Sequence, residues 1–166
     1  PNIADNKELV KYFRNASQYS VKLLNNDGSV AVEGEKVVFN INGVFYTKAT
    51  NASGIATLNI NLNPGKYIVT AIYKECMVSN NITVLPTVIA KDGNITQGNS
   101  FVATVVDGCG NPLANQSVTF NINGVFYNKT TADDGVASLN IRLLRGEYII
   151  TSIWNSYQIG NKITIS

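Results

Sequence analysis

The sequence predicts an all-β protein made of two similar β-sandwich domains, and three observations lead to this prediction. Apolar and polar residues alternate with a period of two, as in strands that are buried on one face only. Turn-forming pairs such as Asn42-Gly43 separate the alternating runs. The segment 39–46, Phe-Asn-Ile-Asn-Gly-Val-Phe-Tyr, recurs unchanged at 120–127.

The repeat extends well beyond this segment. Aligned at an offset of 81 without gaps, residues 19–85 and 100–166 are identical at 26 of 67 positions. A unit of about 80 residues suits a small self-contained domain. We therefore expect two domains, 1–85 and 86–166. Because no Gly/Ser-rich linker lies near Leu85-Pro86, we expect them to be joined closely in an extended rod.

Each unit is expected to contain about seven strands. In the second unit they are predicted at 87–91, 101–107, 117–123, 125–131, 136–143, 147–154 and 161–166. The first unit repeats them at the same offset, with an opening strand within 3–13. Residues 7–14 are predicted as strand rather than as a helical turn, because Val88-Ile89 occupies the similar place in the second copy. Seven short strands with regular turn signals predict a pair of tandem immunoglobulin-like β-sandwiches.

Two tyrosines support this architecture. Tyr67 and Tyr148 each follow a Gly-containing turn and precede a strand, as in the corner where a tyrosine hydroxyl bonds back to the backbone. Tyr73 and Trp154 occupy matched positions and are expected in the core or at its border. Cys76 and Cys109 fall in turns of different domains, so we expect no disulfide between them.

Composition argues against several classes of function. The 13 Lys and Arg residues nearly balance the 11 Asp and Glu residues, which gives no electrostatic case for binding nucleic acid. Histidine is absent, which removes the usual general base and the commonest metal ligand. No apolar run approaches the roughly 18 residues that span a bilayer. We expect no enzyme activity, no cofactor, no metal and no membrane insertion of these residues.

The sequence also resembles a known family. The segments 37–46, 51–60 and 62–71, with their second copies, are similar to the tandem Ig-like repeats of adhesin-like surface proteins of methanogenic archaea. They resemble more distantly the bacterial Ig-like modules of invasin-type adhesins. Copy 1 departs from the usual pattern at 26–34, and copy 2 has Arg145 where Pro is usual.

The resemblance implies a fragment of an extracellular, cell-surface adhesin-like protein with further repeats. Its tandem repeats would mediate or project cell adhesion, with other cells, surface glycans or surface proteins as partners. Two other interpretations stay open. The chain could be a passive structural spacer or stalk, or an accessory module of a cell-wall enzyme.

Candidate contact residues come from the repeated aromatic pairs. Phe45 and Tyr46, like Phe126 and Tyr127, are neighbours on one strand, so one member of each pair is expected to point outward. An exposed aromatic ring can stack on a sugar or anchor a protein contact, although cross-strand packing within the sheet is the alternative. Asparagines that alternate with apolar residues form either a carbohydrate-facing surface or an ordinary solvent face; they are Asn40, Asn42, Asn59, Asn61, Asn121, Asn123 and Asn140.

Asparagine is abundant, and six asparagines lie in Asn-x-Ser/Thr sequences. These candidate glycosylation sites are Asn15, Asn51, Asn81, Asn94, Asn115 and Asn128. An Asn-rich genome would give the same excess without glycosylation. Two other chemistries are disfavoured. Asp133-Asp134 could hold calcium, but the matching turn of copy 1 has no carboxylate, and no repeated acid supports a Lys–Asn isopeptide cross-link.

Overall fold

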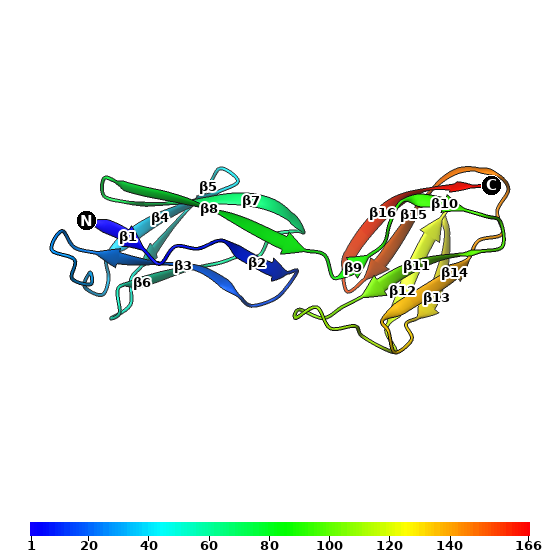
Figure 1. Cartoon of the computed structure of the whole chain (residues 1–166), viewed down its shortest axis with the longest axis horizontal. Coiled ribbons are helices and arrows are strands. Elements are labelled where there is room, and N and C mark those ends of the chain that lie inside the picture. Colours follow the sequence, from blue (N-terminus) through cyan, green and yellow to red (C-terminus); the bar gives the residue numbers. More distant parts are fainter. The chain divides into compact units, whose positions relative to one another are not determined.

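The computed structural model describes residues 1–166 and contains strands and turns but no helix. The chain divides into two compact units, Pro1–Leu85 (unit 1) and Pro86–Ser166 (unit 2). Within each unit two sheets pack face to face (Figure 1). Each unit is an immunoglobulin-like β-sandwich.

Unit 1 contains a three-stranded and a five-stranded sheet. Their orders are β1-β3-β6 and β2-β8-β7-β4-β5. The strands are β1 (Asn2–Ala4), β2 (Leu9–Tyr12), β3 (Gln18–Leu24), β4 (Lys36–Ile41), β5 (Val44–Ala49), β6 (Ile55–Asn59), β7 (Gly65–Tyr73) and β8 (Cys76–Leu85).

Unit 2 repeats this arrangement. Its sheets have the orders β9-β11-β14 and β10-β16-β15-β12-β13. The strands are β9 (Val88–Ile89), β10 (Gly93–Ile95), β11 (Ser100–Val105), β12 (Ser117–Ile122), β13 (Val125–Thr130), β14 (Val136–Asn140), β15 (Gly146–Trp154) and β16 (Tyr157–Ile165).

The opening strand of each unit differs from the prediction, because it is split between the two sheets. β1 pairs antiparallel with β3, whereas β2 pairs in parallel with β8. Between them the polar residues 5–8 form the crossover, and Asp5 has a φ of 55°, which interrupts an extended chain. Each unit therefore has eight strands rather than seven. The prediction of strand within 7–14 is confirmed by β2.

The ungapped alignment of the two copies is wrong by one residue in β3. Tyr19 pairs with Leu58, and Phe101 pairs with the equivalent Leu139, so the offset here is 82 rather than 81. Copy 1 has one more residue than copy 2 between this strand and the next, β4. Since side chains alternate between faces, a shift of one residue would have turned the core side of β3 to solvent.

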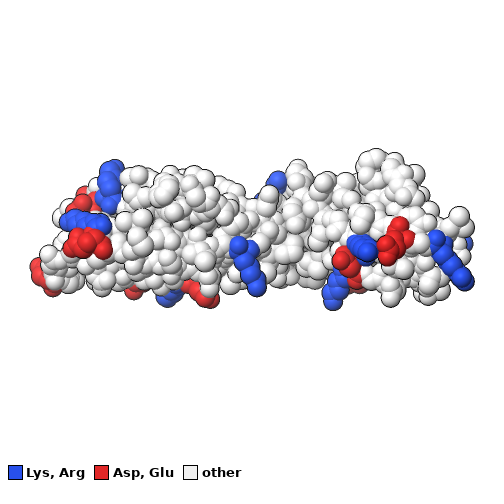
Figure 2. All heavy atoms as spheres, turned by 90° about the horizontal axis from the view of Figure 1, so that it is seen from above, with Lys and Arg blue, Asp and Glu red and all other residues white.

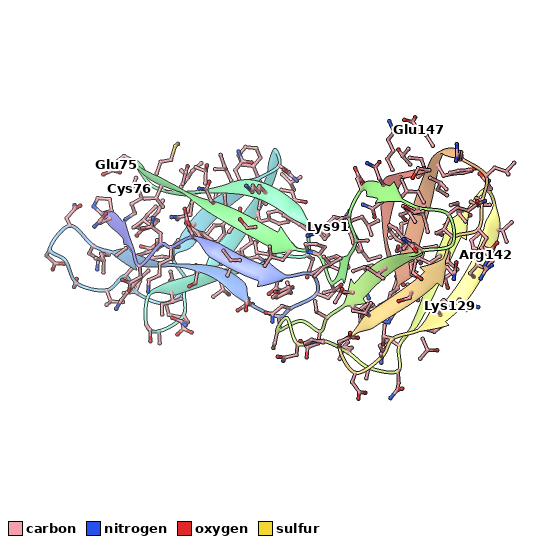
Figure 3. All side chains as sticks on the ribbon, turned by 45° about the vertical axis from the view of Figure 1, so that its right-hand side comes forward. Glu75, Cys76, Lys91, Lys129, Arg142 and Glu147 are labelled. Atoms are coloured by element: carbon pink, nitrogen blue, oxygen red, sulfur yellow. The ribbon has the colours of Figure 1, made fainter.

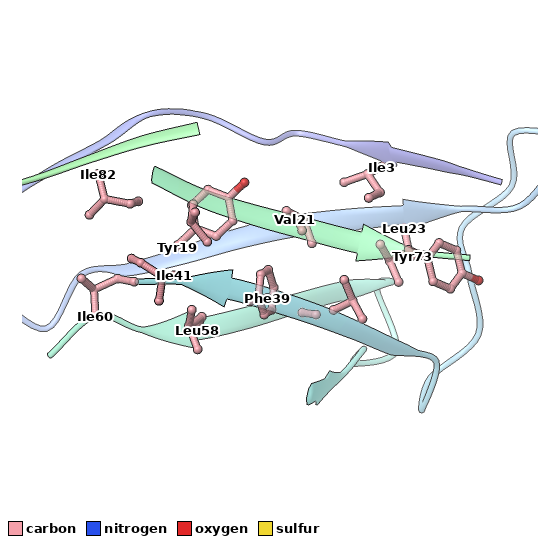
Figure 4. Packing of buried hydrophobic residues seen from close by; sticks show 14 of the residues in the cluster. Ile3, Tyr19, Val21, Leu23, Phe39, Ile41, Leu58, Ile60, Tyr73 and Ile82 are labelled. Carbon is pink, nitrogen blue, oxygen red and sulfur yellow. The ribbon is translucent and has the colours of Figure 1, made fainter. Parts of the chain in front are cut away.

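The core of each unit lies between its two sheets, and Figure 4 shows the core of unit 1. Phe39 and Phe120 are fully buried, and each packs edge to face on an aromatic ring of the facing sheet. The ring centroids of Phe39 and Tyr19 lie 5.8 Å apart, and those of Phe120 and Phe101 lie 6.0 Å apart. Such aromatic pairs add about 0.5–1.5 kcal/mol beyond the area they bury. The repeated Phe-Asn-Ile motif is therefore a core element first.

A two-residue turn connects β4 to β5 and β12 to β13. Asn42 and Gly43 have φ angles of 55° and 73°, and Asn123 and Gly124 have 53° and 75°. A two-residue hairpin turn whose twist matches that of its strands requires a positive φ at both central positions. Asn and Gly adopt a positive φ with little steric strain. Asn42 and Asn123 thus belong to turns, and not to the strand faces on which we expected them.

Both tyrosine corners are confirmed. The Tyr67 hydroxyl donates a hydrogen bond to the Asn63 carbonyl oxygen at 2.6 Å, and the Tyr148 hydroxyl donates to the Leu144 carbonyl oxygen at 2.7 Å. The second bond forms although Arg145 replaces Pro, because the acceptor is a backbone group. Tyr73 is buried and Trp154 half-buried, as expected for core and border positions.

Candidate binding surface

The repeated aromatic pairs lie on β5 and β13, the edge strands of the five-stranded sheets. Phe45 stands opposite Asn40 on the outer face, and Phe126 stands opposite Asn121 in the same way. Each phenylalanine side chain is 62% exposed. The ring edge and face of both residues are therefore available to a ligand.

Tyr46 and Tyr127 point to the other side of the sheet. Their cross-strand neighbours are the buried Phe39 and Phe120. They are nevertheless 39% and 38% exposed, because the three-stranded sheet is too narrow to cover the edge of its five-stranded partner. The expected alternation is present, but both members of each pair are accessible. Tyr46 lines a pocket of about 180 Å³ with Leu58 and Leu62 of unit 1.

Side chains of three neighbouring strands form one line across the outer face. In unit 1 Thr70 of β7 lies opposite Asn40 of β4, which lies opposite Phe45. In unit 2 the line is Thr151, Asn121 and Phe126. We call this arrangement the Phe–Asn–Thr row.

The asparagine at the centre of each row has no side-chain hydrogen-bond partner in the chain, whereas the Thr70 hydroxyl lies 2.9 Å from the Ser79 hydroxyl. Both Asn40 and Asn121 are half-buried between their neighbours. Each amide can donate two hydrogen bonds and accept two. The row therefore offers an unused amide beside an exposed ring.

An exposed isoleucine extends each row. Ile68 precedes Thr70 by two positions on β7 and is 61% exposed, and Ile149 holds the same position on β15 at 60%. Sequence reasoning did not single out the isoleucines or the threonines. The signal was present, since both alternate with buried residues on the strand that follows the tyrosine corner.

Charge is sparse on this face of unit 1. Figure 2 shows no Lys, Arg, Asp or Glu over the middle of its upper surface, and charged side chains gather at the end that holds the β7–β8 turn. An ion pair there joins Lys74 and Glu35 at 4.0 Å. In unit 2 a pair between Lys162 and Glu147, at 3.5 Å, lies on β16 and β15 beside the row. The three side chains of each row are uncharged.

The asparagines do not form a single surface. Asn40 and Asn121 lie on the outer face of the five-stranded sheets, whereas Asn59 and Asn140 lie on β6 and β14 of the three-stranded sheets. The Asn59 side-chain oxygen also accepts a hydrogen bond from Gln18. Asn61 follows β6. Of the seven asparagines expected on one surface, only Asn40 and Asn121 share a face with the phenylalanines.

The six glycosylation candidates are spread over both units. Asn15 is half-buried, and the other five are exposed: Asn51, Asn81, Asn94, Asn115 and Asn128. The Asn51 side-chain oxygen accepts hydrogen bonds from the backbone N–H groups of Ser53 and Ile55, which leaves its nitrogen toward solvent. Asn81 stands opposite Ile68 on the outer face of unit 1, close to the row.

The acidic turns serve the fold. Asp134 accepts a hydrogen bond from the Val136 N–H, and no group of three His, Cys, Asp or Glu residues could hold a metal ion. Hydrogen bonds from the backbone N–H groups of Asn111 and Cys109 lower the pKa of Asp107. A bond from the Asn161 amide lowers the pKa of Asp92. Both carboxylates stabilise loops and face no reactive partner.

The two cysteines form no disulfide, and the one buried lysine bonds to a backbone oxygen. Both cysteines are free; Cys76, beside Glu75 at the β7–β8 turn (Figure 3), donates to the Pro1 carbonyl oxygen at 2.9 Å. Lys11 is buried, its Nζ donates to the Ile60 carbonyl oxygen at 2.7 Å, and desolvation lowers its pKa. No helix in the structure could cross a membrane.

Hollows beside the strand crossovers are not alike in the two units. In unit 2 a hollow of about 360 Å³ is lined by apolar residues that include Ile95, Phe101 and Ile163 and by one charged residue, Lys91. In unit 1 the corresponding hollow of about 510 Å³ is lined by Asp5, Lys7 and Glu8 among others. The rows, in contrast, keep the same chemistry in both units.

Comparison with solved structures supports the fold. A tandem of the I9–I11 domains of titin matches 98% of the chain at 15% sequence identity, with a TM-score of 0.51. Invasin, a bacterial integrin-binding protein, matches 99% at 18% identity with a TM-score of 0.42. The D0–D1 domains of intimin match 99% at 16% identity with a TM-score of 0.37. Of these three, the titin tandem has a TM-score above 0.5, and it supports the Ig-like fold.

The chain spans 64% of the titin fragment, 38% of the invasin structure and 96% of the intimin domains. No protein-family model matches the sequence, and no curated protein matches it. At these identities the comparisons bear on the fold alone.

Proposed function

We propose that the chain is part of an extracellular cell-surface adhesin of the kind that its repeats resemble, the adhesin-like proteins of methanogenic archaea. The two units contact other cells, surface glycans or surface proteins, and further repeats of the parent chain extend them. They perform no enzymatic chemistry and need no cofactor or metal. The observation that carries this proposal is the Phe–Asn–Thr row, which presents the same exposed ring beside the same unused amide in both units.

Physical chemistry favours contact through these rows over a passive stalk. A spacer needs only a folded core and a soluble surface, and an exposed phenylalanine on a flat sheet adds nothing to either. Aromatic side chains are enriched in protein contacts because they bury a large area with few rotatable bonds. Phe45, Tyr46, Phe126 and Tyr127 are therefore the proposed contact residues.

A binding assay tests the proposal. The purified chain is incubated with a panel of microbial cells and isolated surface polymers, and bound protein is measured against concentration. We expect saturable binding by the unchanged chain. The double variant Phe45→Ala with Phe126→Ala should bind with at least tenfold lower affinity. The matched control is Val32→Ala with Leu144→Ala, which truncates two exposed apolar side chains outside the rows.

Three outcomes are decisive. Equal binding by the double variant would remove the rows from the adhesive surface. An absence of binding by a chain shown to be folded would favour the spacer. Binding restricted to isolated cell-wall polymer would favour an accessory module of a cell-wall enzyme.

We further propose that the Asn-x-Ser/Thr asparagines carry glycans on the parent protein. Five of the six side chains are exposed. Peptide mass spectrometry of protein taken from its own cells would show the added sugar mass on these peptides, and unmodified peptides throughout would exclude it. A glycan on Asn81 would cover Ile68 and so limit access to the row of unit 1.

A further inference from the structure

The Phe–Asn–Thr row has the groups that recognise a sugar ring. One face of a pyranose carries C–H groups, which pack on an aromatic ring, and its rim carries hydroxyls. The Asn40 amide can donate to one hydroxyl and accept from its neighbour, and the Thr70 hydroxyl can do either. Phe45 and Thr70 flank that amide on the neighbouring strands β5 and β7. Adjacent strands lie about 4.8 Å apart, which is the scale of one sugar residue.

The charges on this face indicate which sugars fit. An acidic polysaccharide is held by Lys or Arg side chains that pair with its carboxylates or sulfates. The row contains no charged side chain, and the middle of the unit 1 face shows none (Figure 2). In unit 2 the one cation beside the row, Lys162, is paired with Glu147. The exposed lysines on the outer face of unit 1, Lys36 and Lys66, lie four positions along their strands from Asn40 and Thr70. The row itself therefore suits an uncharged sugar and offers an acidic one no cation.

The duplication suits a ligand that repeats. Phe45 and Phe126 are equally exposed, and Asn40 and Asn121 are both without a side-chain partner. A polysaccharide presents the same residue many times, so each row meets copies of the same ligand. Many copies of one ligand residue suit a chain that carries the same site twice. A single protein epitope would not need two copies.

We propose that each row binds pyranose residues of a neutral surface polysaccharide. This inference rests on the proposed adhesive function and specifies its ligand. Phe45 and Phe126 stack on the sugar ring, and Asn40 and Asn121 hydrogen-bond to adjacent hydroxyls.

Affinity electrophoresis of the full chain tests the ligand class. Native gels contain mannan or galactan as neutral probes, polygalacturonate as an acidic probe, or no polysaccharide. We expect retardation by a neutral probe and none by polygalacturonate. Two double variants are compared with the unchanged chain: Phe45→Ala with Phe126→Ala, and Asn40→Leu with Asn121→Leu. Each should raise the apparent dissociation constant for the neutral polysaccharide at least tenfold. The control Val32→Ala with Leu144→Ala should migrate like the unchanged chain. Thermal melting verifies that each variant is folded.

Treated cells separate this inference from the adhesive function. Periodate cleaves sugar rings at neighbouring hydroxyls, whereas protease removes surface proteins. Loss of cell binding after periodate, but not after protease, supports the inference. Binding that survives periodate and is lost after protease overturns it and leaves adhesion standing. Retardation only by polygalacturonate, or retardation of the Phe and Asn variants equal to that of the unchanged chain, also overturns it. A complete lack of cell binding rejects the proposed function itself.

Discussion

The Tyr19 hydroxyl donates a hydrogen bond to the Asn80 side-chain oxygen inside unit 1, and unit 2 lacks this bond. In unit 2 Phe101, which has no hydroxyl, takes the place of Tyr19, and Asn161 takes the place of Asn80. The Asn161 nitrogen donates to Asp92 at 2.9 Å, but its buried oxygen has no partner. An unpaired buried acceptor costs about 1–3 kcal/mol, so unit 2 has a specific weakness.

Phe101→Tyr should repair this weakness. The new hydroxyl would reach the Asn161 oxygen as Tyr19 reaches Asn80, and the free energy of unfolding of unit 2 should rise by about 1 kcal/mol. Trp154, the single tryptophan, reports unit 2 by fluorescence during urea denaturation. Tyr19→Phe, the converse change, should destabilise unit 1 by a similar amount in calorimetry. An unchanged stability of Phe101→Tyr would mean that the oxygen already has a water partner, and a lower one that the new hydroxyl does not reach it.

Alkaline pH should weaken unit 1 through the same tyrosine. Burial raises the pKa of Tyr19 from 10.0 to about 12. Between these values the unfolded chain loses the phenol proton and the folded chain keeps it. The unfolded state then binds fewer protons, so stability falls as pH rises, by about 2–3 kcal/mol in total. Below pH 10 this contribution is fully present.

Melting temperatures of the full chain measured from pH 8 to 12 check this dependence. Tyr19→Phe should melt lower at pH 8 and show a shallower decline above pH 10. Parallel declines for both proteins would assign the alkaline loss to other groups.

The two tyrosine corners should contribute comparable stability. Tyr67→Phe and Tyr148→Phe each remove a single hydroxyl that bonds to a backbone carbonyl, and each should cost about 1 kcal/mol in denaturant unfolding. Tyr46→Phe is the control, because its hydroxyl has no partner in the chain. A cost for Tyr46→Phe as large as for Tyr67→Phe would argue against a role of the corner bond.

Lys48 and Lys129 should protect the free edges of the five-stranded sheets. They are the charged residues of β5 and β13 (Figure 3 labels Lys129), and Lys48 faces the core side, opposite the buried Val37. A strand that added to this edge would bury the ammonium group. The double change to Val should therefore increase self-association, measured by sedimentation velocity over a range of concentrations. Lys22→Val with Lys162→Val, on interior strands, loses the same charge and should remain monodisperse.

Much of the fold was predictable because local chemistry and the fold agree. Asn42-Gly43 can adopt the two positive φ angles of its turn, and Tyr67 and Tyr148 recur at the same distance after a Gly-containing turn. The split opening strand was not predictable in this way. It depends on which sheet has a free edge for Leu9, and that is a long-range pairing with Ile82. The one-residue shift at β3 was detectable, since only the shifted alignment keeps Tyr19 and Phe101 on the core side.

The candidate surface was predicted in part. Phe45 and Phe126 were identified from the repeat, but the exposure of Tyr46 required knowing that β5 extends past the smaller sheet. Sequence spacing could not join Asn40 to Thr70, because they are far apart along the chain and only strand pairing makes them neighbours. Asn40 and Asn59 both alternate with apolar residues in the sequence, and only the strand pairing shows that they lie on different sheets.

The parallel pairing of the opening strand with the last one sets how each unit responds to pulling. When tension acts on the two ends of a unit, β2 and β8 are drawn in opposite directions along their shared axis. Their hydrogen bonds are then loaded in shear and must break together, whereas a hairpin would unzip one bond at a time. Unit 1 pairs four residues here and unit 2 only three. Under a rising force unit 2 should therefore yield first and lengthen the chain while unit 1 still holds.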